Sequence, residues 1–90
     1  MVYSSLILQK WHKYKKTLTN NLKIVSASLT PYLEYNDVTK IYISKESKKI
    51  LLCELVPNQE ENKIINCTLS IGETIILEAE GGNDVDLLIE

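Results

Sequence analysis

The sequence lacks long apolar runs, and this absence limits the class of protein. No stretch approaches the roughly 20 consecutive apolar residues that a membrane-spanning helix needs. The apolar patch at residues 6–8 is too short for the hydrophobic region of a secretory signal peptide. We therefore expect a soluble, intracellular chain without direct membrane contact.

Cysteine and histidine are scarce, which leaves little material for a metal centre. The chain has two cysteines, Cys53 and Cys67, and one histidine, His12. The cysteines lack CxxC spacing, and His12 has no cysteine or carboxylate neighbour in the sequence. We expect free thiols, an exposed histidine, and neither a metal nor another cofactor. The spacing leaves open whether the two thiols are close to each other.

Motifs that carry catalytic chemistry are missing as well. A phosphate-binding loop needs a glycine-rich turn that opens a helix, but the only glycine pair, Gly81 and Gly82, joins two strand-like runs. The serines have no histidine base, and the carboxylates are scattered over turns. Nothing around Glu34 and Asp37 indicates the burial that acid–base catalysis requires. We predict no catalytic residues and no enzyme within this chain.

Charge is balanced in total but uneven along the chain. Ten basic and 12 acidic residues give a formal net charge of −2, which indicates no partner class by itself. Every charged residue before Glu34 is a lysine, whereas residues 73–90 contain six acids and no base. Antiparallel strands could bring the two ends together as solvated ion pairs, and this interpretation has equal weight with a functional one.

Trp11 and Tyr14 lie among four lysines within residues 10–16. We expect this stretch to be an extended loop followed by a short strand. Stacking rings and cations are what a nucleic-acid site needs. Lysine stems and rings that cover the edge of a core explain the same residues, and we favour this packing interpretation. Nucleic acid is therefore not an expected partner.

The sequence is rich in short strand-like runs, the clearest of which form a hairpin at residues 40–56. Two aliphatic and β-branched runs flank the polar segment 45–48, which indicates a loop of about four residues. Side chains alternate between the two faces of a strand. Alternation therefore divides the second run into one face with Leu51, Cys53 and Leu55 and another with Ile50, Leu52 and Glu54.

Six further runs have the same character, and the last two are joined by the hairpin-type turn Gly81-Gly82-Asn83-Asp84. The runs lie at residues 3–9, within 10–16, and at 22–29, 64–71, 74–80 and 85–90. Eight short strands with no repeat and no linker predict one all-β domain over residues 1–90. We expect an eight-stranded antiparallel jelly roll or β-sandwich, with a small barrel as a variant.

Several outward-facing positions of these strands are apolar. Their side chains cannot all face water without creating an adhesive surface. We predict that they line a contact between identical subunits. The residues are Ile50, Leu52, Ile76 and Leu88.

The order of segments is also informative. It comprises the strand at 22–29, an acid-containing loop, Ile41-Tyr42-Ile43 with the hairpin into 49–55, and Gly81-Gly82-Asn83-Asp84 leading into Val85-Asp86-Leu87. This order resembles the core domain of the nucleoplasmin family, in particular the nucleoplasmin-like domain that precedes the isomerase domain of nuclear FK506-binding proteins. The resemblance implies a nuclear jelly roll that forms pentameric rings, sometimes stacked as decamers, and acts as a chaperone for core histones of either pair.

The resemblance further implies that surface carboxylates shield the basic histones. A ring of five copies multiplies every carboxylate fivefold, so that weak contacts add up. The carboxylates expected to bind histones are Glu34, Asp37, Glu60, Glu61, Glu78, Glu80, Asp84 and Asp86. A long acidic tract is absent from the 90 residues, so such a tract, or a peptidyl-prolyl isomerase domain, would belong to a longer natural chain.

Two other classes compete with this interpretation. The first is a purely structural oligomerisation module that positions another domain and has no ligand of its own. The second is a jelly-roll capsid or carbohydrate-binding protein, against which the single tryptophan and the lack of metal-ligand clusters argue. Neutralising the loop acids separates the first class from a chaperone, because only a chaperone would lose histone binding.

Overall fold

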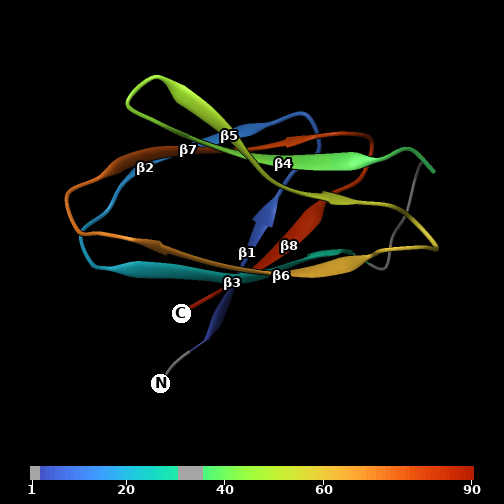
Figure 1. Ribbon diagram of the computed structural model, residues 1–90, viewed down its shortest axis with the longest axis horizontal. Coiled ribbons are helices and arrows are strands. Elements are labelled where there is room, and N and C mark those ends of the chain that lie inside the picture. Colours follow the sequence, from blue (N-terminus) through green and yellow to red (C-terminus); the bar gives the residue numbers. More distant parts are fainter. Residues whose placement is uncertain (1–2, 31–35) are drawn as a thin grey trace.

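A computed structural model describes residues 3–30 and 36–90, and these form a sandwich of two antiparallel sheets (Figure 1). The strands are β1 (Ser4–Leu8), β2 (Lys13–Thr17), β3 (Leu22–Leu29), β4 (Thr39–Lys45), β5 (Lys48–Leu55), β6 (Asn62–Leu69), β7 (Thr74–Glu80) and β8 (Val85–Ile89). The predicted eight-stranded all-β architecture is confirmed. Within these two ranges there is no helix of the length and apolarity needed to cross a membrane.

The chain passes from one sheet to the other at almost every connection. One sheet has the strand order β1-β8-β3-β6 and the other β2-β7-β4-β5, which lies above β3 and β6 in Figure 1. Among the described strands, only β4 and β5 are consecutive in the chain and paired in one sheet. The turn at residues 81–84 joins β7 and β8 across the sandwich, so its interpretation as a hairpin was wrong.

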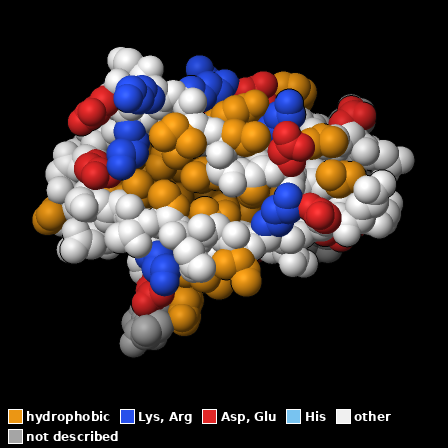
Figure 2. Space-filling model, in the orientation of Figure 1, with side chains coloured by type: hydrophobic (Ala, Val, Ile, Leu, Met, Phe, Trp, Pro, Cys, Tyr) orange, Lys and Arg blue, Asp and Glu red, His pale blue; other side chains and the backbone are white. Residues whose placement is uncertain are grey.

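The core lies between the sheets and is built from alternate positions of the strands. In β7, the predicted inward residues Ile75, Leu77 and Ala79 are buried, and Val85 and Leu87 are buried in β8. Figure 2 shows apolar side chains gathered between the two layers, with charged side chains around them. The other buried apolar residues are Leu8, Leu18, Ile24, Ala27, Leu29, Ile41, Ile43, Cys53, Leu55 and Leu69.

The turn of the central hairpin is tighter than predicted. Lys45 pairs with Lys48, so the turn contains two residues, Glu46 and Ser47, rather than four. Their φ angles are 49° and 67°. Positive φ at both central positions is the geometry of a type I′ turn, whose twist matches that of the two flanking strands.

A β-bulge in β5 changes which side chains face the core. Ile41 pairs with Cys53 but Tyr42 pairs with Leu51, which leaves Leu52 as the extra residue. Cys53 is buried as predicted, but Leu51 is 45% exposed and Leu52 packs against the core. The prediction of Leu51 inward and Leu52 outward was therefore wrong, because one extra residue reverses the alternation.

The two cysteines belong to opposite sheets and are free thiols, as predicted. Cys53 is buried on β5, and Cys67 is half-buried on β6 and packs against the core. Burial raises the pKa of the Cys53 thiol, an effect that nearby Lys63 partly opposes. The protonated thiol behaves as a small apolar side chain.

Candidate functional site

The carboxylates predicted to bind histones lie on several parts of the sandwich. Glu78 and Glu80 belong to β7, Asp84 and Asp86 lie in and after the β7–β8 turn, and Asp37 precedes β4. Glu60 and Glu61 lie between β5 and β6. Glu34 lies outside the described residues. The fold therefore does not gather the predicted acids into one cluster within a single chain.

Lys49 neutralises two of these acids on the outer face of the β2-β7-β4-β5 sheet. Its Nζ lies 2.8 Å from Glu80 Oε2 and 3.3 Å from Glu78 Oε1. The same Nζ lies 4.3 Å from the centroid of the Tyr42 ring. The hydrogen bond to Glu80, supported by Glu78, raises the pKa of Lys49. Glu78 and Glu80 thus present little free charge to a partner.

The acids between β5 and β6 stabilise their own loop. Glu60 Oε2 lies 2.9 Å from Lys63 Nζ, and its hydrogen bond raises the pKa of Lys63. Glu61 Oε2 accepts a 2.7 Å hydrogen bond from the backbone N–H of Asn58, a residue with a φ of 63°. Glu60 remains exposed, so its ion pair competes with water and is easily exchanged for another cation.

The acids after β7 are less accessible. Asp84 Oδ1 accepts a 2.9 Å hydrogen bond from the backbone N–H of Lys10, which ties the β7–β8 turn to the β1–β2 turn. Asp86 is half-buried on the outer face of β8, between Ile7 of β1 and Ser28 of β3. Asp37, in contrast, is exposed before β4 and has no ion pair with a described residue.

The four residues predicted for a subunit contact lie on different surfaces. Ile50 is 51% exposed on β5, and Ile76 is half-buried on the outer face of β7 in the same sheet. Leu88 is half-buried on the outer face of the opposite sheet, between Ser5 and Ser26. Leu52 packs against the core.

Sequence patterns missed one of the most exposed apolar side chains. Ile64 of β6 is 78% exposed on the outer face of its sheet, in register with Ser26. Asn66 in the same strand has a φ of 54°, which disturbs the alternation of β6. An asparagine within a strand-like run is the only signal that could have indicated this irregularity.

The lysines of the amino-terminal half stay apart from the carboxyl-terminal acids. All five residues of β2 are exposed, and Lys13 is in register with Glu78. The ion pairs of Glu73, Glu78 and Glu80 nevertheless go to Lys45 and Lys49 of the hairpin. Within residues 3–30 and 36–90, Lys13, Lys15 and Lys16 form no ion pair with a carboxylate.

A metal centre finds no ligand set in the described part of the chain. No group of three or more His, Cys, Asp or Glu side chains lies close enough together to hold an ion.

Comparisons with known proteins place this fold. The family of nucleoplasmin-like domains matches residues 4–88. FK506-binding protein 4 of Rhizopus delemar is 30% identical over 74 residues, which are 82% of this chain but 19% of that protein. The chain thus spans about a fifth of this relative, and most of the relative lies outside the matched segment.

Two solved structures are similar in shape. The nucleoplasmin-like N-terminal domain of Drosophila FKBP39 has a TM-score of 0.83 at 18% identity, covering 97% of this chain and 84% of that one. The Drosophila NLP core, whose crystal structure bears on pentamer formation and histone binding, has a TM-score of 0.82 at 11% identity, covering 96% and 93%. With eight antiparallel strands in the same sandwich and a match over nearly its whole length, this chain belongs to the nucleoplasmin-like domain family.

Proposed function

We propose that this chain is the non-catalytic core of a nuclear histone chaperone, which assembles into a ring and shields core histones with surface carboxylates. The family match over residues 4–88 carries this proposal. The Drosophila NLP core, which shares the fold, is a protein described in terms of pentamer formation and histone binding. The same domain would retain this role as the first part of a longer chain.

The exposed loop acids contribute most of the histone contact in this proposal. Asp37 and Glu60 are exposed, and Glu61 is half-buried beside them in sequence. Glu78 and Glu80 contribute less because Lys49 already pairs with both. Glu34, Asp84 and Asp86 complete the proposed acidic set. Each contact is weak, and several copies in one ring make the sum useful.

Ring assembly uses the apolar residues on the two outer faces. Ile50 and Ile76 lie on the β2-β7-β4-β5 sheet, whereas Leu88 lies on the opposite sheet. A closed ring needs two different, complementary surfaces on each copy, and opposite faces of a sandwich meet that condition. Leu52 supports the contact by packing beneath β5. We propose a pentamer, with a decamer as its stacked form.

A salt series with a matched control tests the chaperone role. The triple variant Asp37→Asn, Glu60→Gln, Glu61→Gln removes three exposed or half-buried acids, and we expect at least a tenfold weaker pull-down of core histones at low salt. The control triple Glu46→Gln, Glu54→Gln, Glu90→Gln removes the same charge outside the proposed set and should bind within about twofold of the wild type. Testing both histone pairs identifies the preferred cargo.

Native mass spectrometry of the same variants separates the two remaining classes. A chaperone loses histones while its ring keeps its size. Wild-type rings that bind no histones at low salt, or binding that does not change with salt, contradict the proposal and leave the structural oligomerisation module. Equal losses in both triple variants would mean that only net charge matters.

A further inference from the structure

Trp11 occupies a backbone position that favours glycine. Its φ is 61°, in the left-handed region that bulky side chains rarely enter. The backbone N–H of Trp11 donates to Ala79 O at 2.9 Å, and His12 O accepts from Ala79 N at 3.4 Å. Two residues therefore oppose one, which is a β-bulge whose left-handed first residue is usually glycine.

The turn that carries Trp11 is held on both sides. The His12 backbone N–H donates to Gln9 O at 3.1 Å, and the His12 ring Nδ1 lies 2.8 Å from Lys10 O. The Lys10 backbone N–H donates to Asp84 Oδ1. This network fixes the indole in place and keeps the strained conformation from relaxing.

Packing does not compensate for this strain. Trp11 is 68% exposed and lies outside the core. The indole therefore does not cover a core edge, which removes the packing interpretation that the sequence favoured. A rigidly held, strained and exposed aromatic ring is an observation that points to a ligand.

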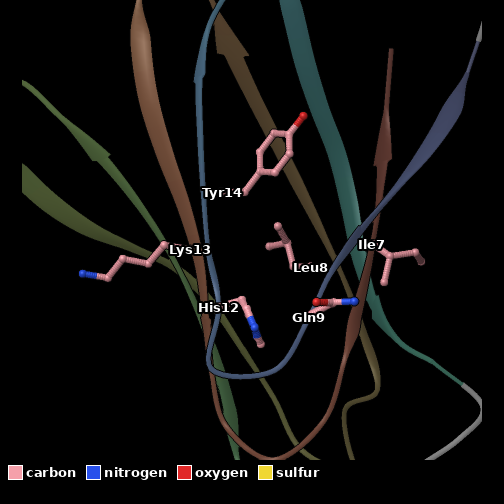
Figure 3. Close-up of a pocket in the computed structure, with 6 residues that line it drawn as sticks. All are labelled: Ile7, Leu8, Gln9, His12, Lys13 and Tyr14. Carbon is pink, nitrogen blue, oxygen red and sulfur yellow. The ribbon is translucent and has the colours of Figure 1, made fainter.

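The edge strand that follows carries exposed cations on both of its faces. Lys13 and Lys15 lie in register with the outward residues Glu78 and Ile76 of β7, and Tyr14 and Lys16 point to the other side. Figure 3 shows Lys13 and Tyr14 extending in different directions beside a cavity of about 260 Å³ between β1 and β2. Tyr14 is 40% exposed.

We propose that Trp11 and β2 form a binding site for single-stranded nucleic acid. Bases stack on the Trp11 indole and on the exposed part of Tyr14, and phosphates contact Lys13, Lys15 and Lys16. Alternate residues on a strand are about 6.6 Å apart, comparable to adjacent phosphates of an extended single strand. A duplex is excluded from this mode because its bases are already stacked on each other.

Neighbouring acids set the direction of the strand. Asp37 lines a cavity of about 230 Å³ together with Lys10, Trp11 and Gly82. Its carboxylate repels phosphates, so the phosphate path leads from Trp11 along β2 toward Thr17 and away from Asp37. This site uses lysines and goes beyond the histone-binding role, which uses carboxylates.

The intrinsic fluorescence of the protein tests the stacking directly. Trp11 is the single tryptophan of the chain, so the signal reports on this residue alone. We expect a 20-nucleotide oligo(dT) to quench the fluorescence in a saturable manner. Heparin, a polyanion without bases, should cause no such quenching. Equal responses to both polyanions, or binding of the oligonucleotide without quenching, would overturn the stacking role.

Two variants and one control separate the contributions of ring and charge. Trp11→Gly should weaken oligo(dT) binding at least tenfold, measured by anisotropy of a labelled strand, while its thermal midpoint equals or exceeds that of the wild type. The triple variant Lys13→Gln, Lys15→Gln, Lys16→Gln should also bind weakly and should lower the slope of log K against log salt by about 2.

The control triple Lys23→Gln, Lys40→Gln, Lys48→Gln removes the same charge from other surfaces and should bind within about twofold of the wild type. Wild-type affinity in the Trp11→Gly variant contradicts the proposal, as does equal weakening by both lysine triples. Histone pull-downs with the Trp11→Gly variant should be unchanged, so this test and the chaperone test can fail independently.

Discussion

Gly81 is the residue at which the two sheets come closest through their backbones. It has a φ of 155°, and a Cβ at this position would lie 2.8 Å from the Thr39 Cα and 2.7 Å from its Oγ1. Thr39 is fully buried at the start of β4 and cannot move aside without shifting the strand. Only glycine therefore allows the β7–β8 turn to pass over β4.

We predict that Gly81→Ala lowers the free energy of unfolding by about 3 kcal/mol, because backbone must move to accommodate the methyl group. Chemical denaturation measures this change. Gly72→Ala is the matched control, since Gly72 has a φ of 90° and open space around it. The control should lose only the conformational cost of about 1 kcal/mol, and equal losses in both variants would contradict the steric explanation.

At the scale of the element, the β4–β5 hairpin is a second place where local geometry can be tested. Glu46 and Ser47 both adopt positive φ, a conformation that Asn-Gly adopts with less strain. Replacing Glu46-Ser47 by Asn-Gly should stabilise the protein by about 1 kcal/mol in the same denaturation assay. Ser44→Gly places glycine in the extended strand β4 instead and should destabilise it by about 0.5–1 kcal/mol.

The strands themselves could be predicted from the sequence because alternation and turn residues are local signals. Residues 22–29 and 74–80 form strands with the expected bounds. The bulges could not be predicted, since Leu52 becomes the extra residue only when β5 pairs with β4 in this register. The same limit applies to the glycine-type conformation of Trp11, which depends on hydrogen bonds to Ala79.

The candidate site was harder to predict than the strands, because pairing decides which charges remain available. Acidic residues at loops and turns were recognised by type. That Lys49 would reach both Glu78 and Glu80 required the strand order β7-β4-β5, which brings residues about 30 positions apart onto one face. Local patterns contain no information on such an order.

At the scale of the whole molecule, apolar outer faces must be covered for the chain to remain dispersed. Ile50 is half exposed on one sheet, and the side chains of Ile7 and Ile64 are exposed on the other. A domain of this size has a small core, so that association adds stability which a single copy lacks. Covering both faces with identical copies links stability to assembly.

We therefore predict that the wild-type protein migrates in native mass spectrometry as a closed ring of five 10.3 kDa chains at micromolar concentration. The double variant Ile50→Lys, Ile76→Lys places charges in the proposed contact and should shift the population to monomers that keep the β-sheet circular dichroism spectrum. Ile71→Lys, at an exposed residue beyond the end of β6, is the control and should leave the ring intact. A wild-type monomer at this concentration, or a double variant that retains the ring, would refute assembly through these faces, and the multivalent histone contact would lose its physical basis.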